Sequence, residues 1–364
     1  MDPRKAGSVE AALRRALKAA VASDWPTAET WLERIVEADS ADLDAYHALA
    51  RLYREQGTIG RALRMHQNLL LRGDLDQNQR NEALLELARD FDVGGFGERA
   101  AAGYEAVRDV LPRHQESLTR LVALLHGLRE FPRALALIRR LRRLDRETAD
   151  TAEIEILLSQ AQAQTEEGNP EAARTSLKRC LRRDKTCGSA WAMLGELEVE
   201  RGKDAKALDA WRRGALADPK AAADLYPKLA AGYSARGKPQ DFEKLLRGIL
   251  EDRPGDHAAR IALARVLSGR GETSQAIEEL SRAVEVAPTD TGLRIELGRQ
   301  LLEGASETEA LKAYASLLDA LDYALTPAIG GSSSNASGHP SENALDHHSG
   351  RGIEGTAGAG ETAD

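Results

Sequence analysis

Arginine is the residue type whose placement in this sequence points most directly to chemistry. Five arginines and one histidine form the candidate site: His47, Arg51, Arg54, Arg89, Arg265 and Arg299. A guanidinium group carries a planar fork of donors that pairs bidentately with a carboxylate. If the fold places these side chains on one wall, we expect them to bind carboxylates of a partner segment.

Motifs of the common catalytic sites are missing from the sequence. It has no glycine loop with a phosphate-binding lysine, no HExxH, no CxxC and no nucleophile elbow. Gly94, Gly95 and Gly97 surround Phe96, but we interpret this stretch as the turn between two helices. We therefore predict a protein that is not an enzyme, with no cofactor, no metal site and no catalytic residue.

Composition and charge indicate the cellular compartment and the class of partner to expect. The formal net charge of -8 over 364 residues gives no general case for nucleic acid. Glu10, Arg14 and Lys18 interrupt the N-terminal stretch, which excludes a signal peptide or a membrane span there. Two cysteines agree with a reducing compartment, and we interpret Cys180 as a buried structural residue. The prediction is a cytoplasmic protein.

Repeated helical pairs must position the candidate site. A unit that begins at Gly188 has Trp191 at its fourth place and Ala207 at its twentieth. The twentieth place recurs every 34 to 39 residues, at Ala28, Ala62, Ala100, Ala134, Ala173, Ala207, Phe242, Ala276 and Ala310. This spacing resembles the tetratricopeptide helix–turn–helix. The resemblance implies an all-α, right-handed superhelical solenoid of about nine units.

The repeat pattern also sets domain boundaries. We expect a flexible N-terminus over residues 1–8, the repeat array over 9–322 and a disordered tail rich in glycine and serine over 323–364. Phe242 stands where alanine is expected, so repeat seven should be the least regular unit and a hinge.

The inner wall of such a solenoid comes mainly from the first helix of each unit, at its second, fifth, ninth and twelfth places. His47, Arg51 and Arg54 occupy the last three of these places in repeat two. Arg89, Arg265 and Arg299 occupy the ninth place of repeats three, eight and nine. No obvious equal negative charge accompanies Arg51, Arg54 and Arg89, so we predict a partner-binding groove. No asparagine occupies an inner place, which speaks against the carboxylate clamp of chaperone-binding members of the family.

Two basic runs lie on the second helices of repeats four and five. They comprise Arg139, Arg140, Arg142, Arg143 and Arg146, followed by Lys178, Arg179, Arg182 and Arg183. Their outer position favours solubility or an acidic partner over nucleic acid, because aromatic stacking residues do not interleave.

Repeats two and three carry a narrower resemblance. Their matching residues include Gly57, His66, Gln67, Arg89 and Asp90. This run is similar to the lipopolysaccharide assembly protein B family of bacterial scaffolds, which implies work with an inner-membrane protease and the committed deacetylase of lipid A synthesis. The sequence has neither the membrane helix nor the rubredoxin-like zinc domain typical of that family, so tethering and zinc are not implied. We interpret His66 as a buried, hydrogen-bonded histidine.

The sequence therefore predicts a scaffold or adaptor that binds protein or peptide segments. One role is lipopolysaccharide assembly and regulation of lipid A synthesis, with a membrane protease or a lipid A biosynthetic enzyme as partner. The alternative is a generic co-chaperone or assembly factor for another bacterial complex. A nucleic-acid-associated regulator is the weakest of the three.

Overall fold

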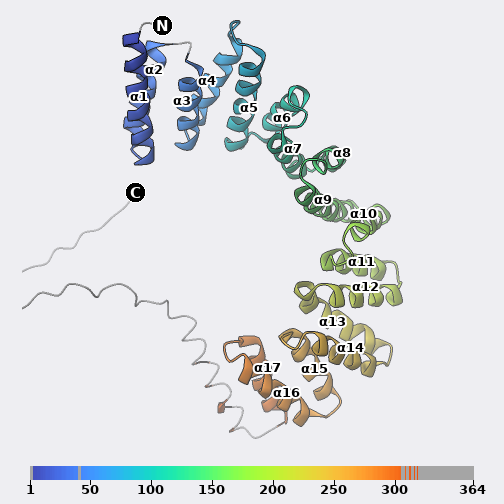
Figure 1. Cartoon of the computed structure of the whole chain (residues 1–364). Helices are drawn as coiled ribbons and strands as arrows, with labels where there is room; N and C mark the ends of the chain where they lie inside the picture. The colour runs from blue at the N-terminus through green and yellow to red at the C-terminus, as the bar shows by residue number, and fades with distance from the viewer. Residues whose placement is uncertain are drawn as a thin grey trace, which may run out of the picture.

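The computed structural model describes residues 3–39 and 42–304, with the single residues 308, 311, 312, 315 and 318. Over these residues the chain is a succession of helices (Figure 1). The helices are α1 (Pro3–Val21), α2 (Trp25–Ala38), α3 (Leu43–Glu55), α4 (Ile59–Leu71), α5 (Gln77–Val93), α6 (Gly97–Val110), α7 (Gln115–Gly127), α8 (Phe131–Leu141), α9 (Arg146–Glu166), α10 (Pro170–Arg183), α11 (Gly188–Glu200), α12 (Asp204–Ala217), α13 (Pro219–Ala235), α14 (Pro239–Asp252), α15 (His257–Gly269), α16 (Thr273–Val286) and α17 (Thr291–Gly304). The predicted all-α solenoid is confirmed.

Each repeat contributes one odd-numbered helix and the even-numbered helix that follows it. α17 is the first helix of repeat nine, and Ala310, expected on the second, lies outside the described residues. The expected tail, residues 323–364, lies outside them too.

Three helix starts show how the chain departs from the ideal repeat. α1 begins at Pro3, whereas the pattern suggested about Val9, because proline suits a first helical turn and good helix formers follow it. The extra residues before repeats three and five extend α5 and α9 at their N-termini. Asp76 caps α5 with Gln79 in a reciprocal capping box, and Asp145 caps α9.

Backbone dihedrals confirm the register of the repeats. The fifteenth place has a positive φ in the first eight repeats, at Ser23, Gly57, Gly95, Arg129, Gly168, Gly202, Gly237 and Gly271. This left-handed residue turns the chain from the first helix into the second, and glycine adopts it without steric cost. The interpretation of Gly95 as a turn residue is confirmed.

The core is spread along the solenoid. The twentieth-place residues from Ala28 to Ala276 are each at most 1% exposed, because the two helices of a repeat cross closely there. Phe242 is buried as well and stacks on Tyr233, with ring centroids 5.8 Å apart. Cys180 is fully buried and free, as expected of a structural cysteine.

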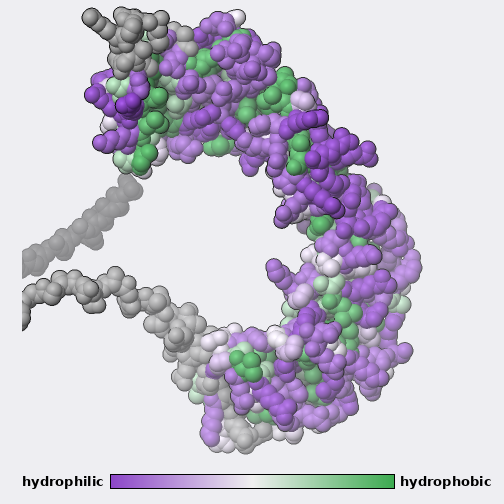
Figure 2. All heavy atoms as spheres, viewed as in Figure 1, coloured by the Kyte–Doolittle hydropathy of each residue, from purple (hydrophilic) through white to green (hydrophobic). Residues whose placement is uncertain are grey.

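The helix pairs follow an open arc (Figure 1). α9, α13 and α17 border its hollow side, whereas α8, α10 and α14 lie on its outer side. Hydrophilic side chains dominate the outer side, and hydrophobic ones reach the hollow side near α17 (Figure 2). The first helices of the repeats therefore supply the inner wall.

Candidate functional site

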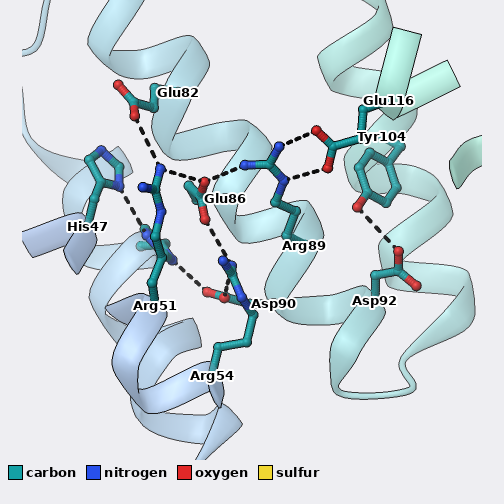
Figure 3. A network of polar contacts seen from close by, with 11 residues as sticks. His47, Arg51, Arg54, Glu82, Glu86, Arg89, Asp90, Asp92, Tyr104 and Glu116 are labelled. Carbon is teal, nitrogen blue, oxygen red and sulfur yellow. Dashed lines mark hydrogen bonds and ion pairs between the residues drawn. The ribbon is translucent and has the colours of Figure 1, made fainter. Parts of the chain in front are cut away.

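Glu86 is the centre of the polar network in repeats two and three (Figure 3). It lies on α5, is 0% exposed, and accepts hydrogen bonds from arginines on two helices. Arg51 Nη2 lies 2.9 Å from Glu86 Oε1, and Arg54 Nη1 lies 2.9 Å from Oε2. Arg89 Nη1 also donates to Oε1, at 2.5 Å. One buried carboxylate thus joins α3 to α5.

A chain of buried side chains continues from this network into the interior. Asp90 Oδ1 accepts from Arg54 at 2.9 Å, and Asp90 Oδ2 lies 2.5 Å from His66 Nδ1. His66 Nε2 lies 3.1 Å from His47 Nδ1. Asp90 and His66 are fully buried, and His47 is 4% exposed. The prediction that His66 is a buried, hydrogen-bonded histidine is confirmed.

Burial and pairing shift the pKa values of this network. Burial alone would raise the pKa of Glu86, but hydrogen bonds from Arg51 and Arg54 outweigh burial and lower that pKa to about 2. Burial lowers the pKa of His47, and the neighbouring His66 lowers it further. Near neutral pH, Glu86 is therefore a carboxylate and His47 is neutral.

A second network repeats this arrangement in repeats eight and nine. Glu296 on α17 is 2% exposed and accepts from Arg265 Nη2 on α15 at 2.8 Å. Arg299 on α17 donates to the same carboxylate, from Nε at 3.2 Å. Burial would raise the pKa of Glu296, but the bonds from Arg299 and Arg265 lower it to about 2.

The two networks use the same places of the repeat. Glu86 and Glu296 stand at the sixth place, and each is bound by the ninth-place arginine of its own repeat and of the preceding one. We call this arrangement an arginine clamp, the Glu86 clamp or the Glu296 clamp. Because each clamp joins consecutive first helices, it fixes the spacing of the inner wall.

The expectation that no equal negative charge accompanies the arginines is wrong. Beside Arg51, Arg54 and Arg89 stand four carboxylates: Glu82, Glu86, Asp90 and Glu116. Glu82 lies 3.5 Å from Arg51, and Glu116 pairs with Arg89. Apart from Arg89 with Glu86, which lie three positions apart, these pairs join residues 27 to 36 positions apart, and the sequence does not show such distant pairing.

The predicted site residues accordingly fall into two groups. His47 is buried and the Arg54 side chain is only 11% exposed, so they are placed to hold the wall rather than to contact a partner. Arg51, Arg265 and Arg299 keep about half of their side chains exposed, and Arg89 about a quarter. A clamp glutamate holds one part of each of these four guanidinium groups. A second carboxylate holds another part of two of them, Glu116 in Arg89 and Glu303 in Arg299.

Beside the Glu296 clamp the inner wall has a hollow of about 550 Å³ between α13 and α15. We call it the inner hollow. Tyr226, Ala230, Ile261 and Val266 give it an apolar lining, and Arg265 also lines it. Phe242 contributes from α14. Arg270 is a second cation in the lining, and such a mostly apolar hollow can receive an apolar side chain of a partner.

Pro227 adds a backbone feature to the inner hollow. It lies inside α13 and has no N–H to donate to the carbonyl of Ala223, four residues earlier. Both residues line the inner hollow.

Sequence reasoning missed Pro227 and the buried glutamates of the two clamps, Glu86 and Glu296. For the clamps, the available signal in the sequence is glutamate at the sixth place of a repeat with arginine at the ninth. For Pro227, the signal is a proline within an expected helix.

Among residues 3–39 and 42–304 no group of three or more histidines, cysteines or carboxylates is placed to hold a metal ion. No helix in the described part of the chain is both long enough and apolar enough to cross a membrane.

Family models of the tetratricopeptide repeat match residues 154–187 and 234–294. The chain contains tetratricopeptide repeats and folds as an all-α tetratricopeptide solenoid, a class of protein that commonly serves as a protein-binding scaffold.

Among curated proteins the chain is similar to lipopolysaccharide assembly protein B. The protein of that name from Escherichia coli K12 is 24% identical over 255 residues, which are 70% of this chain and 65% of the relative. The one from Haemophilus influenzae is 25% identical over 262 residues, which are 71% of this chain and 64% of the relative. The matched part thus spans slightly less than two thirds of these relatives.

Among solved structures, a tetratricopeptide repeat protein from Parabacteroides merdae is 14% identical to the chain. That match covers 81% of this chain and 99% of the other, with a TM-score of 0.38.

Proposed function

We propose that this protein is a scaffold whose inner wall binds an extended segment of a partner protein. The observation that carries the proposal is the inner hollow beside the Glu296 clamp. An apolar side chain of the partner enters between Ile261 and Tyr226. A carboxylate of the same segment reaches the exposed edge of Arg265, which lines this hollow.

The clamps order the inner wall before a partner segment binds. Solenoid repeats contact only their neighbours, so the wall is as regular as the contacts between consecutive first helices. The Glu86 and Glu296 clamps fix those contacts near both ends of the described array. A wall that is ordered before binding loses less conformational entropy when the partner segment arrives.

The finer proposal places this scaffold in lipopolysaccharide assembly, with a role in regulating lipid A synthesis. Its support is the similarity to proteins named lipopolysaccharide assembly protein B, which extends over 70% of the chain. The partner is then a membrane protease or a lipid A biosynthetic enzyme. Arg51, Arg89, Arg265 and Arg299 are the proposed contact residues, and His47 and Arg54 hold their wall in place.

Site-directed photocrosslinking tests this function. A photoreactive amino acid replaces Ile261 on the inner wall, and a second variant carries it at Leu216, an exposed residue of α12. Both variants are expressed in bacterial cells, and crosslinked proteins are identified by mass spectrometry. A protease or lipid A enzyme captured at 261 but not at 216 supports the proposal. Capture of unrelated machinery at 261 supports the assembly-factor alternative, and equal capture at both positions contradicts an inner-wall site.

A further inference from the structure

A second hollow lies between α10, α11 and α12, and α10 is on the outer side of the arc (Figure 1). Its volume is about 610 Å³. We call it the basic hollow, and its lining residues are Thr175, Lys178, Leu181, Arg182, Lys185, Trp191, Leu194 and Arg213. None of them belongs to the inner wall described above.

The charge of the basic hollow has one sign. Four cations line it and no acidic residue does. Lys178, Arg182 and Lys185 are exposed, and no acidic side chain of the described residues lies within ion-pair distance of them. Arg213 pairs with Asp209 at 2.9 Å. In a chain with a net charge of -8, residues 174–187 carry six basic side chains and one acidic one.

A neighbouring ion-pair cluster adds to the positive field. Glu153 of α9 is 2% exposed and binds three arginines: Arg142 at 2.5 Å, Arg179 at 3.0 Å and Arg183 at 2.8 Å. Arg142 also pairs with Asp150 at 2.7 Å. Arg146 also lies 3.5 Å from Asp150, so four guanidinium groups share two carboxylates. This cluster fixes α10 against α9 and leaves an excess positive charge next to the basic hollow.

The floor of the basic hollow is apolar and already ordered. Leu181 and Leu194 form it, each 8% exposed. Trp191 stands beside them, with Nε1 donating to the carbonyl of Lys185 at 2.9 Å. The guanidinium carbon of Arg213 lies 5.4 Å from the centroid of the Trp191 ring. An apolar side chain can therefore enter a hollow whose rim is cationic.

We infer that the basic hollow binds an acidic protein segment in which an apolar side chain is flanked by carboxylates. The apolar side chain packs on Leu181 and Leu194, and the carboxylates pair with Lys178, Arg182 and Lys185. This site stands independently of the inner wall, so the scaffold can hold two partner segments at once, one on each side of the arc.

The geometry favours a protein segment over other anionic partners. A lipid bilayer takes up apolar groups that project from a surface, but Leu181 and Leu194 are recessed. Single-stranded nucleic acid needs free aromatic faces for base stacking, and Arg213 covers the Trp191 ring. An acidic protein segment with one apolar side chain fits the basic hollow in both respects. The apolar side chain reaches the recessed leucines, and the carboxylates pair with the cations.

Fluorescence anisotropy on the full chain tests this inference. The probe is a fluorescein-labelled peptide with one leucine between two runs of glutamate. We expect it to bind with an affinity that falls by about tenfold or more as salt rises from about 50 to about 300 mM. The variant Lys178→Glu/Arg182→Glu should weaken binding by at least about tenfold. The charge-matched control Arg64→Glu/Lys244→Glu changes exposed cations on α4 and α14 and should bind as the wild type does.

Other probes decide between general attraction and the proposed site. A peptide with serine in place of the leucine should bind more weakly than the leucine peptide. Equal binding of these two peptides, or unchanged binding by Lys178→Glu/Arg182→Glu, overturns the inference. It is also overturned if oligodeoxythymidine or phosphatidylglycerol vesicles bind more tightly than the leucine peptide and lose that binding in the same variant.

Discussion

The carboxylate of Glu86 and the guanidinium group of Arg54 lie 2.9 Å apart, with the glutamate fully buried and the arginine 11% exposed. The two residues belong to consecutive repeats, on α5 and α3. An unpaired glutamate carboxylate would be unfavourable at this depth. Because Arg54 belongs to the preceding repeat, the burial of Glu86 depends on side chains of both repeats. The inner wall therefore depends on charge pairing as well as on apolar packing.

Removal of the buried charge should destabilise the array. Glu86→Gln keeps the shape of the side chain but leaves Arg51, Arg54 and Arg89 with one fewer anion, and we expect a loss of about 3 kcal/mol in the free energy of unfolding. Glu82→Gln removes an exposed partner of Arg51 and should cost less than about 1 kcal/mol. Urea denaturation measures both. Equal effects would show that burial of the Glu86 clamp has no energetic consequence.

Acid should weaken the fold in two steps. The pKa of His47 is lowered from its ordinary value of 6.5, so the folded state binds fewer protons there than the unfolded chain, and stability falls as pH drops below about 6.5. The pKa of Glu86 is lowered from 4.5 to about 2, so its contribution is complete above pH 4.5 and is lost between 4.5 and 2.

Urea denaturation at pH 7, 6 and 5 tests the first step. The variant His47→Gln should show a smaller decline in stability over this range than the wild type. An identical decline in both proteins would mean that His47 is not the titrating group.

Two glycine substitutions should change stability in opposite directions. A methyl group at Gly195 would overlap the ring of Trp211, so Gly195→Ala should cost about 1 to 3 kcal/mol. At Gly248, inside α14, a methyl group meets nothing within 4 Å, and Gly248→Ala should add about 0.5 to 1 kcal/mol. Thermal unfolding of both variants checks the sign. A stabilised Gly195→Ala protein would contradict the close contact between α11 and α12.

Arg129 occupies a turn place that glycine fills in six other repeats. Its φ is 60°, in the left-handed region that disfavours side chains. Arg129→Gly and Arg129→Ala both remove the exposed ion pair with Glu166, so their difference isolates the backbone. We expect the glycine variant to be more stable than the alanine variant by about 1 kcal/mol. Chemical denaturation would refute this if alanine proved equal or better.

The repeat fold could be predicted from sequence because close helix crossings restrict residue type. Ala28 and Ala207 are small and buried at matching places, and the left-handed turn at Gly202 selects glycine. These constraints act within one repeat, over a few tens of residues. They therefore produce a repeating pattern of residue types in the sequence.

The charge balance of the candidate site could not be predicted in the same way. Arg51 meets Glu86 only because consecutive repeats stack with a particular rotation, and a single repeat does not encode that rotation. Glutamate on an amphipathic helix is by default a solvated residue, so its burial at Glu86 and Glu296 was not expected. The inner hollow beside Pro227 depends on the same stacking.

The most direct test of the binding wall is the affinity of the partner captured at position 261 for two charge-matched variants. Ile261→Glu places a carboxylate in the inner hollow, whereas Leu216→Glu places one on an exposed part of α12. Isothermal titration calorimetry should show Kd raised at least about tenfold by Ile261→Glu and unchanged by Leu216→Glu, with both proteins equally folded. A Kd for Ile261→Glu equal to that of the wild type would contradict the inner wall as the binding surface.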